Sequence, residues 1–300
     1  MFLLVSYKKI EGNDMRFNTP LRYPGGKGKL TQYFKEIIDK NNLKGCHYAE
    51  PFAGGAGLAL NLLAHGYVEH VYLNDINPAV YAFWHSVLYR NDELCSLIEN
   101  TDVTMSEWHK QRDVMNKLDL SDLLILGFSA FFLNRTNRSG ILLGGVIGGK
   151  KQEGEWKLDA RFNKANLIQR IKAIGDNSKK VSVYNLDAVD FIDSVVKKLP
   201  EISLTYIDPP YYVKGEGLYE NHYIHDNHVA IADKIINEIK SPWVVSYDNV
   251  KEIATMYEGC KTLDYELSYS AHERKKGMEL MFFSRDLVIP KTSDPAKYKK

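Results

Sequence analysis

The chain has 300 residues, of which 44% are hydrophobic, so it can bury a core as one large domain or as a domain with an insertion. Its 39 Lys and Arg residues balance 38 Asp and Glu residues, so whole-chain charge predicts no partner. Three scattered cysteines without a C-x-x-C pair argue against a disulfide framework or a zinc site, so we expect no metal and a reducing cytoplasm. No apolar run is long enough for a signal peptide or a membrane span, and we expect no membrane partner.

Predicted helices and strands alternate along most of the chain. The first part contains, in order, a helix over 29–40, a strand over 46–50, a helix over 58–64, a strand over 71–73 and a helix from 78 to about 89. A mostly helical stretch, interrupted by the glycine-rich residues 139–154, then extends to about residue 175. The remaining elements are a strand over 181–184, a helix over 187–198, a strand over 203–207, a helix near 228–239, and strands over 243–246, 260–269 and 278–286.

This alternation predicts an α/β fold with a largely parallel sheet and helices on both faces, in which ligands gather at the carboxyl ends of the strands. We expect residues 15–80 and 179–288 to form this sheet domain and residues 81–178 to be an insertion. Residues 1–14 are expected to be an N-terminal extension, and residues 289–300 a flexible tail.

The segment TYIDPPYY places an acid, two prolines and two tyrosines directly after the predicted strand 203–207. Proline has no amide proton and a fixed φ, so Pro209 and Pro210 end the strand abruptly and hold the turn rigid. The Asp208 carboxylate and the Pro209 carbonyl could accept both protons of an exocyclic amine and direct its lone pair toward an electrophile. The aromatic face of Tyr211 could hold the base in line. The alternative is a structural turn with a half-exposed tyrosine.

Two further loops follow predicted strands. EPFAGGAG is a glycine turn that lets a ligand approach the backbone at a helix N-terminus, although it is not a G-x-G-x-x-G fingerprint and could be only a tight turn. Asp75 follows Gly55 by twenty positions, about the spacing at which such folds place an acid on ribose hydroxyls. Asp75 could instead be a helix N-cap.

PLRYPGGKGKL, over residues 20–30, lacks the spacing of a phosphate-binding loop. A glycine pair before Lys27 at a helix start nevertheless suits an anionic group such as a carboxylate. A basic N-terminal turn without a ligand explains this stretch equally well.

In the order PLRYPGGK, AEPFAGGAG, LNDIN and DPPYY, the chain resembles the Dam-type (α-group) DNA adenine-N6 methyltransferases over most of residues 19–285. The resemblance implies a Rossmann-like methyltransferase sheet with a mostly helical inserted target-recognition domain. It also implies S-adenosyl-L-methionine as the cofactor, double-stranded DNA as the substrate and a cytoplasmic location.

The resemblance assigns a role to individual residues of these motifs. It implies the cofactor's methionine part at Tyr23 and Lys27, its ribose at Asp75, and the loop from Phe52 through Gly54, Gly55 and Gly57 wrapped around it. Asp187 would lie near the cofactor's adenine, with Asp190 as a rival, and either could simply cap a helix. The catalytic residues would be Asp208, which also borders the cofactor, together with Pro209 and Tyr211 stacked on the flipped base.

The predicted insertion is rich in basic residues. Between positions 134 and 172 there are nine of them (Arg135, Arg138, Lys150, Lys151, Lys157, Arg161, Lys164, Arg170 and Lys172) against three acids (Glu153, Glu155 and Asp159). We expect Arg135 and Arg138 to contact guanine in the major groove, and Lys150 and Lys151 to contact phosphates. A second basic cluster, from His272 to Lys276, could also contact DNA. The alternative for both sets is a solvated surface.

These features predict a site-specific DNA adenine methyltransferase that transfers methyl directly, without metal or covalent intermediate, to a base flipped out of the duplex. The run TNRS, over residues 136–139, departs from the family pattern, so the sequence does not predict which DNA site is read. The alternatives are the same chemistry on cytosine N4 or on RNA adenine, and a DNA-binding relative that has lost catalysis. We expect a monomer, and a cognate restriction endonuclease is a candidate partner.

Overall fold

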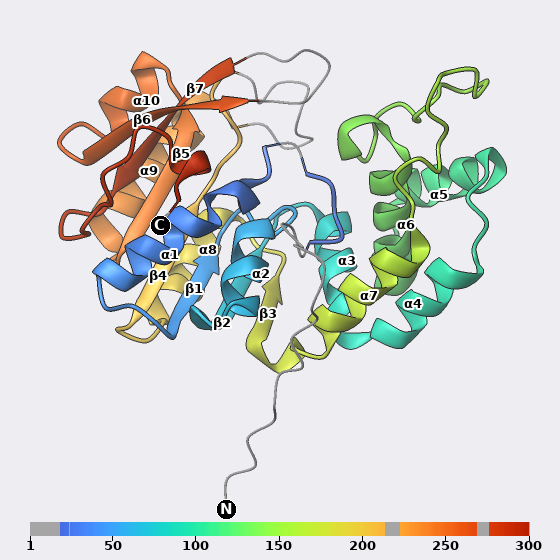
Figure 1. The fold of residues 1–300 in the computed structure, drawn as a ribbon, viewed down its shortest axis with the longest axis horizontal. Coiled ribbons are helices and arrows are strands. Elements are labelled where there is room, and N and C mark those ends of the chain that lie inside the picture. The colour runs from blue at the N-terminus through green and yellow to red at the C-terminus, as the bar shows by residue number, and fades with distance from the viewer. Residues whose placement is uncertain (1–18, 24, 214–222, 269–275, 300) are drawn as a thin grey trace, which may run out of the picture.

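The computed structural model describes residues 19–23, 25–213, 223–268 and 276–299, and its centre is a seven-stranded sheet (Figure 1). The predicted N-terminal extension 1–14 lies outside these residues. Across the sheet the strand order is β3-β2-β1-β4-β5-β7-β6. The strands are β1 (Cys46–Glu50), β2 (Val68–Asn74), β3 (Val181–Tyr184), β4 (Ser203–Ile207), β5 (Trp243–Asp248), β6 (Lys261–Ser268) and β7 (Lys276–Phe283).

Five of the strands are parallel, as the sequence predicted. β1 pairs in parallel with β2 and β4, β2 with β3, and β4 with β5. The last two strands form an antiparallel hairpin whose strand β7 pairs with β5. The α/β fold class is therefore confirmed. Because β1, β2 and β4 run in the same direction, the loops that follow them meet at one edge of the sheet.

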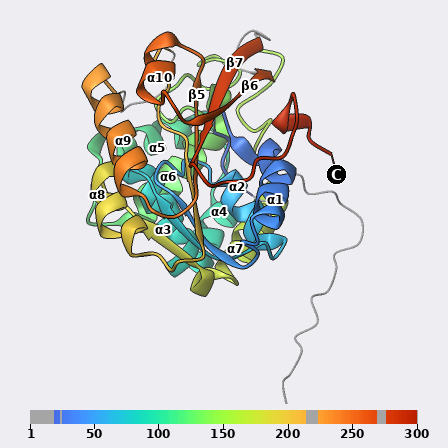
Figure 2. The same ribbon diagram turned by 90° about the vertical axis from the view of Figure 1, so that its left-hand side faces the viewer.

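Helices cover both faces of the sheet, and Figure 2 shows the two layers on opposite sides. One face carries η1 (Lys27–Leu30), α1 (Thr31–Lys40) and α2 (Gly57–Ala64). The other face carries α8 (Ala188–Ser194), η4 (Val196–Lys198), α9 (His225–Glu238) and α10 (Lys251–Met256). The short helix α10 was not predicted, because the six residues KEIATM are too few to show a helical period.

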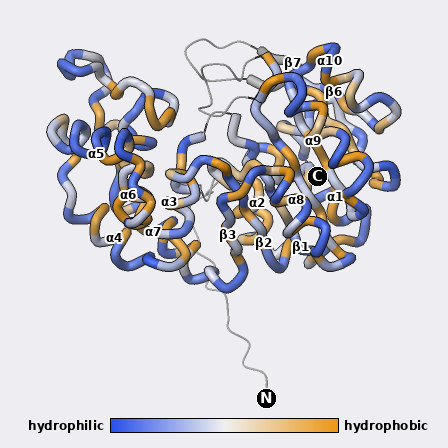
Figure 3. Tube along the Cα trace, turned by 180° about the vertical axis from the view of Figure 1, so that it is seen from behind, coloured by the Kyte–Doolittle hydropathy of each residue, from blue (hydrophilic) through white to orange (hydrophobic). Residues whose placement is uncertain are grey.

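The chain between β2 and β3 is mostly helical, and its longest non-helical stretch, residues 141–163, contains turns and Val146, which forms an isolated bridge with Asn137. Its elements are α3 (Pro78–Tyr89), α4 (Asn91–Asn100), α5 (Met105–Lys117), α6 (Leu123–Thr136), η2 (Arg138–Gly140), α7 (Lys164–Gly175) and η3 (Ser178–Lys180). Figure 3 shows α5 largely in the hydrophilic colour at the outside of this group.

The inserted helices are joined to the sheet through α3. The predicted boundary at residue 80 is wrong in detail, because it falls inside α3, which is continuous from Pro78 to Tyr89. A Cβ added to Gly127 of α6 would lie 2.5 Å from the Ala82 carbonyl oxygen, so only glycine lets α6 approach α3 this closely. Buried residues of α3, α6 and α7 belong to the same hydrophobic core as α1 and α2.

The C-terminal segment corrects a second expectation, that residues 289–300 form a flexible tail. Residues 289–299 contain η5 (Pro295–Lys297), whose Pro295 is buried. Tyr298 makes an edge-to-face contact with Tyr33 of α1 at a centroid distance of 5.7 Å. This segment therefore packs on α1.

Candidate active site

Three loops at the carboxyl edge of the sheet carry most of the predicted site residues. They follow β1, β2 and β4, and they contain Phe52 to Gly57, Asp75, and Asp208 to Tyr211. The side chain of Asn74 ties this edge together, because its Nδ2 donates to the carbonyl oxygens of Pro51, at 2.9 Å, and Leu186, at 3.0 Å. The structure therefore brings the predicted loops to one place.

Tyr23 lies against the glycine turn. Gly54 has φ +46°, and a Cβ added to it would lie 2.6 Å from the Tyr23 ring. A Cβ on Gly55 would lie 3.0 Å from the Tyr23 Cβ, and Gly57 begins α2. Glycine suits position 54 for both reasons, since the left-handed backbone disfavours a side chain and the Tyr23 ring occupies the space of a Cβ.

Asp75 joins the second loop to the first. Its Oδ2 accepts a hydrogen bond from the Gly54 amide at 2.9 Å, and its Oδ1 accepts one from the Asn77 amide at 2.9 Å. The N-cap of α3 is Asn77, whose side chain accepts from the Ala79 and Val80 amides. The alternative that Asp75 itself caps the helix is therefore wrong.

Asp187 caps α8, because its side chain accepts from the Val189 amide at 2.8 Å. Burial raises the pKa of Tyr223, the Asp187 charge raises it further, and the Tyr223 ring lies 5.7 Å from that of Phe52. Asp190 lies exposed in the first turn of α8. Asp187 therefore caps α8, and its charge also acts on Tyr223.

Lys27 contacts Asp208. Its Nζ lies 2.8 Å from both carboxylate oxygens of Asp208 and donates to the Tyr211 hydroxyl at 3.0 Å. The Lys27 side chain is 6% exposed and that of Asp208 is 23% exposed. Lys27 was expected to face the methionine part of a cofactor, but here it neutralises the carboxylate of the DPPY turn.

Tyr211 is fixed at its hydroxyl. It donates to Glu279 of β7, which also accepts from the Tyr265 hydroxyl at 2.5 Å. Tyr211 is 4% exposed, so in this arrangement its ring offers little face to a stacked base. Its predicted stacking role stays a prediction, and it requires that the ring be uncovered.

Ser246 of β5 completes the contacts of Asp208. Its hydroxyl donates to Asp208 Oδ1 at 2.7 Å and lies 2.6 Å from the Tyr206 hydroxyl. We call Lys27, Asp208, Tyr211, Ser246 and Glu279 the Asp208 cluster. Ser246 and Glu279 were missed by the sequence analysis. The available signal for Glu279 was an acid inside the otherwise apolar strand segment MELMFF.

Burial and charge act in opposite directions on this cluster. Burial raises the pKa of Asp208, the Lys27 ammonium lowers it, and the Glu279 carboxylate raises it. Burial also raises the pKa of the nearby Glu50 to about 8, although bonds from Tyr48 and from the Ala59 amide favour its charged form. Lys27 is therefore the main group that favours an ionised Asp208, and the hydrogen bond from Ser246 acts in the same direction.

The two arginines expected to read DNA differ. Arg135 donates from Nε to the Arg161 carbonyl at 2.7 Å and from a terminal nitrogen to the Pro20 carbonyl at 3.4 Å. Burial, together with three neighbouring arginines, lowers its pKa to about 9. These contacts give Arg135 a structural role. Arg138, Lys150 and Lys151 are exposed, as a DNA contact would require.

The second basic cluster, His272 to Lys276, lies outside the described residues except for the backbone of Lys276. In the part of the chain that is described, no group of three His, Cys, Asp or Glu side chains could hold a metal ion. None of the described helices combines the length and apolar character needed to span a bilayer.

A sheet of this order, with a glycine turn after β1, an acid after β2 and the DPPY turn after β4 at one edge, defines a Rossmann-like α/β fold, in which ligands bind at the carboxyl ends of the strands. The family model for D12 class N6 adenine-specific DNA methyltransferases matches residues 23–276. The chain belongs to this family, and it is an S-adenosylmethionine-dependent methyltransferase. Comparison with curated proteins found no significant match.

Several solved structures are similar to this chain at low identity. One is described as an RNA methyltransferase from Pyrococcus horikoshii (10% identity, 93% of this chain and 94% of that chain, TM-score 0.42). Another is described as a class I S-adenosylmethionine-dependent methyltransferase from Listeria monocytogenes (11% identity, 95% and 67%, TM-score 0.40). A third is described as a methyltransferase from Escherichia coli (11% identity, 88% and 91%, TM-score 0.36). The fold assignment rests on the sheet order and the family match.

The cofactor fits the residues present at the carboxyl edge of the sheet. The Asp75 carboxylate is partly exposed beside the Gly54 amide, which is the arrangement that suits ribose hydroxyls. Phe52 and Tyr223 place aromatic surface next to Asp187, which suits an adenine ring with an exocyclic amine.

Proposed function

We propose that this enzyme transfers a methyl group to the N6 amine of an adenine in double-stranded DNA. The observation that carries the proposal is the hydrogen bonding of Asp208. Among the described residues, its Oδ1 accepts from Lys27 and Ser246, whereas its Oδ2 accepts from Lys27 alone. A carboxylate oxygen can accept two hydrogen bonds, so Oδ2 has room for one more N–H donor.

The second acceptor in the proposal is the carbonyl of Pro209. Within the described residues it accepts no hydrogen bond, and it follows Asp208 directly on the rigid turn. An exocyclic amine is a weak nucleophile because its lone pair is delocalised into the ring. Two acceptors, one for each N–H, turn that lone pair toward the electrophile and hold the nitrogen in line.

Asp208 has to be ionised in order to accept this hydrogen bond. Burial opposes ionisation, and the Lys27 ammonium at 2.8 Å favours it. We assign Lys27 to this task, in place of the cofactor contact expected from the sequence. Ser246 and Glu279 then act as positioning residues, because each holds a group of the cluster from a neighbouring strand.

We assign the cofactor to the glycine turn from Phe52 to Gly57, with its ribose at Asp75 and its adenine near Asp187. Bound S-adenosylmethionine supplies an electrophilic methyl group on a positively charged sulfur. The chain's own contribution is to orient: the Asp75 bonds to the Gly54 and Asn77 amides keep its carboxylate fixed at the mouth of the turn.

The target adenine has to leave the duplex, since the Asp208 cluster cannot reach an amine inside a base stack. We propose that residues 81–178 serve as a target-recognition region, in which Arg138 contacts bases and Lys150 and Lys151 contact phosphates. All three side chains are exposed. A cytoplasmic monomer, with or without a cognate restriction endonuclease, completes the proposal.

Expression in a bacterial host without adenine methylation, followed by mapping of modified bases along the genome, tests this function. We expect N6-methyladenine at one short motif, and none in cells that express Asp208→Ala at the same level. Modified cytosine in place of adenine, or unmodified DNA with modified RNA, would contradict the proposal.

A further inference from the structure

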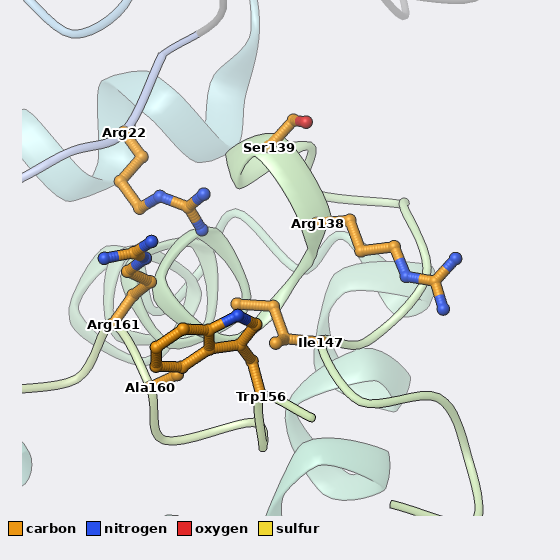
Figure 4. A pocket seen from close by; sticks show the side chains of 7 residues that line it. All are labelled: Arg22, Arg138, Ser139, Ile147, Trp156, Ala160 and Arg161. Atoms are coloured by element: carbon orange, nitrogen blue, oxygen red, sulfur yellow. The ribbon is translucent and has the colours of Figure 1, made fainter. Parts of the chain in front are cut away.

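A pocket of about 230 Å3 lies in the inserted region, outside the Asp208 cluster (Figure 4). It is lined by Arg22, Arg138, Ser139, Ile147, Trp156, Ala160 and Arg161. Its volume is below the roughly 300–1,000 Å3 of pockets that enclose drug-sized ligands, so it suits one unit of a larger ligand that extends beyond it.

Trp156 gives the pocket an aromatic wall. It is 61% exposed, whereas Trp84, Trp108 and Trp243 are between 1% and 5% exposed. Gly148 lies close to its backbone, because a Cβ added to Gly148 would lie 2.7 Å from the Trp156 carbonyl oxygen. An exposed indole offers a face on which a nucleic-acid base can stack.

Three arginines give the pocket its charge. None of its lining residues is acidic, and within the described part of the chain none of these arginines forms an ion pair. Figure 4 shows the guanidinium groups of Arg22 and Arg161 close together beside the indole, and Arg138 turned away from them. Two like charges side by side in a pocket favour an anion between them.

The pocket is tied to the segment that carries Tyr23 and Lys27. The Arg22 amide donates to Asn134 Oδ1 at 2.7 Å, and Asn134 Nδ2 donates to the Arg22 carbonyl at 2.7 Å. One Arg22 guanidinium nitrogen donates to the Asn137 carbonyl at 3.0 Å. The position of an occupant is thereby fixed relative to the chain that leads into the active site.

We propose that this pocket binds one nucleotide of the DNA substrate, with its base stacked on Trp156 and its phosphate between Arg22 and Arg161. An aromatic face beside cations is the combination that holds single-stranded nucleotides, since every base has a face that can stack. The proposal rests on the proposed function, because it takes the substrate to be DNA. It adds a second nucleotide-binding position to that of the target adenine.

Tryptophan fluorescence measures this binding directly, because Trp156 is the exposed one of the four tryptophans. The probes are two 20-base-pair duplexes of one sequence, fully paired or with one unpaired nucleotide at the centre. We expect the second duplex to bind more tightly and to quench the fluorescence. In Trp156→Ala, quenching should be lost and affinity for that duplex reduced roughly 5- to 100-fold. Trp156→Phe should retain most of the affinity.

Arg161→Ala should weaken both duplexes, and Lys240→Ala, which removes an exposed cation just before β5 at the opposite edge of the sheet, is its matched control. Thermal unfolding checks that each variant is folded. If Trp156→Ala binds both duplexes as the wild type does, the proposal is overturned, even where Arg161→Ala weakens binding, since the pocket then holds phosphate only. Methyl transfer to DNA by the wild type, measured alongside, separates this failure from a failure of the proposed function.

Discussion

The Asp208 cluster and the pocket lined by Arg22, Trp156 and Arg161 differ strongly in how far their side chains are exposed and bonded to other residues. In the Asp208 cluster, Lys27, Tyr211 and Glu279 are at most 6% exposed, and hydrogen bonds join Lys27 to Tyr211 and Tyr211 to Glu279. In the pocket, Trp156 is 61% exposed and the arginines have no carboxylate partner among the described residues. The difference indicates which region is organised before the substrate arrives.

A buried network of charges has a fixed geometry because every displaced group would lose a partner that water cannot replace. An exposed aromatic ring with nearby cations keeps its affinity for an outside group. The first arrangement suits the reacting amine, which needs exact orientation, and the second suits a polymer that has to be found and released. Five predictions test this contrast.

The largest effect is expected at Asp208. We expect Asp208→Ala to reduce methyl transfer by about 10²–10³-fold or more, because the amine loses a preorganised acceptor. Cofactor binding by calorimetry should persist. Since Asp208→Ala leaves Lys27 buried without its carboxylate, Asp208→Asn serves as a second variant of nearly the same shape. Transfer within tenfold of wild type in both variants would refute the assignment.

The second prediction tests whether the Lys27 ammonium keeps Asp208 ionised. Transfer should fall as the pH drops through the pKa of Asp208, because the protonated acid no longer accepts the amine N–H. Removal of the ammonium in Lys27→Met takes away the main influence that lowers this pKa, so the acid limb of the kcat profile should move to higher pH. Lys29→Met, at an exposed position of the same short helix, is the control. An unchanged pH profile in Lys27→Met would show that the acid limb of kcat does not report the ionisation of Asp208 beside Lys27.

The third prediction tests whether the Asp75 carboxylate binds the ribose of the cofactor. We expect Asp75→Ala to weaken S-adenosylmethionine binding by about 1.5–3 kcal/mol, the usual magnitude for hydrogen bonds to a charged group. Isothermal calorimetry measures it, and Asp102→Ala, at an exposed position in the insertion, removes a charge elsewhere. Equal affinity in the two variants would place the ribose away from Asp75.

Arg138 and Arg135 test the contrast inside the insertion itself. Arg138→Ala should relax the methylated motif at one position, with a discrimination loss of about 1–3 kcal/mol. Arg135→Ala should lower the melting temperature instead, because its guanidinium contacts two backbone carbonyls. Lys150→Ala should weaken binding to all DNA sequences alike. The slope of the logarithm of affinity against the logarithm of salt concentration should become shallower by about one. A changed motif in Lys150→Ala with an unchanged one in Arg138→Ala would reverse these roles.

Tyr211→Phe should have the smallest effect on transfer, within about tenfold, because the ring remains while the hydroxyl is lost. Stability should fall by about 1–3 kcal/mol, since Glu279 is left buried with one fewer donor. Chemical denaturation gives the second value. A variant of wild-type stability would mean that the contact of Tyr211 with Glu279 contributes nothing to the fold.

The sheet and its edge could be predicted from the sequence because they follow from local patterns. Strands of apolar residues ended by glycine, acid or proline placed Gly54, Asp75 and Asp208 after parallel strands, and parallel strands share an edge. Glu279 and Ser246 could not be placed in the same way. They reach the site from β7 and β5 through strand pairing, which brings residues 68 and 38 positions from their partners into contact.

The insertion was harder to predict for a physical reason. Arg135 and Arg138 are equivalent as residue types, and only the fold shows that one donates to backbone carbonyls while the other is exposed. The boundary at residue 80 was misplaced because α3 has no break where the sheet domain meets the inserted helices. The pocket depends on contacts between Arg22 and Asn134, which are 112 residues apart.

The most direct test of the account is to identify the methylated product. Purified enzyme would be incubated with methyl-labelled S-adenosylmethionine and, separately, duplex DNA, single-stranded DNA and RNA, and each digest analysed for labelled nucleosides. We expect label in N6-methyldeoxyadenosine from duplex DNA, with far less from RNA. Label in N4-methyldeoxycytidine, or in adenosine of RNA above that in DNA, would contradict it.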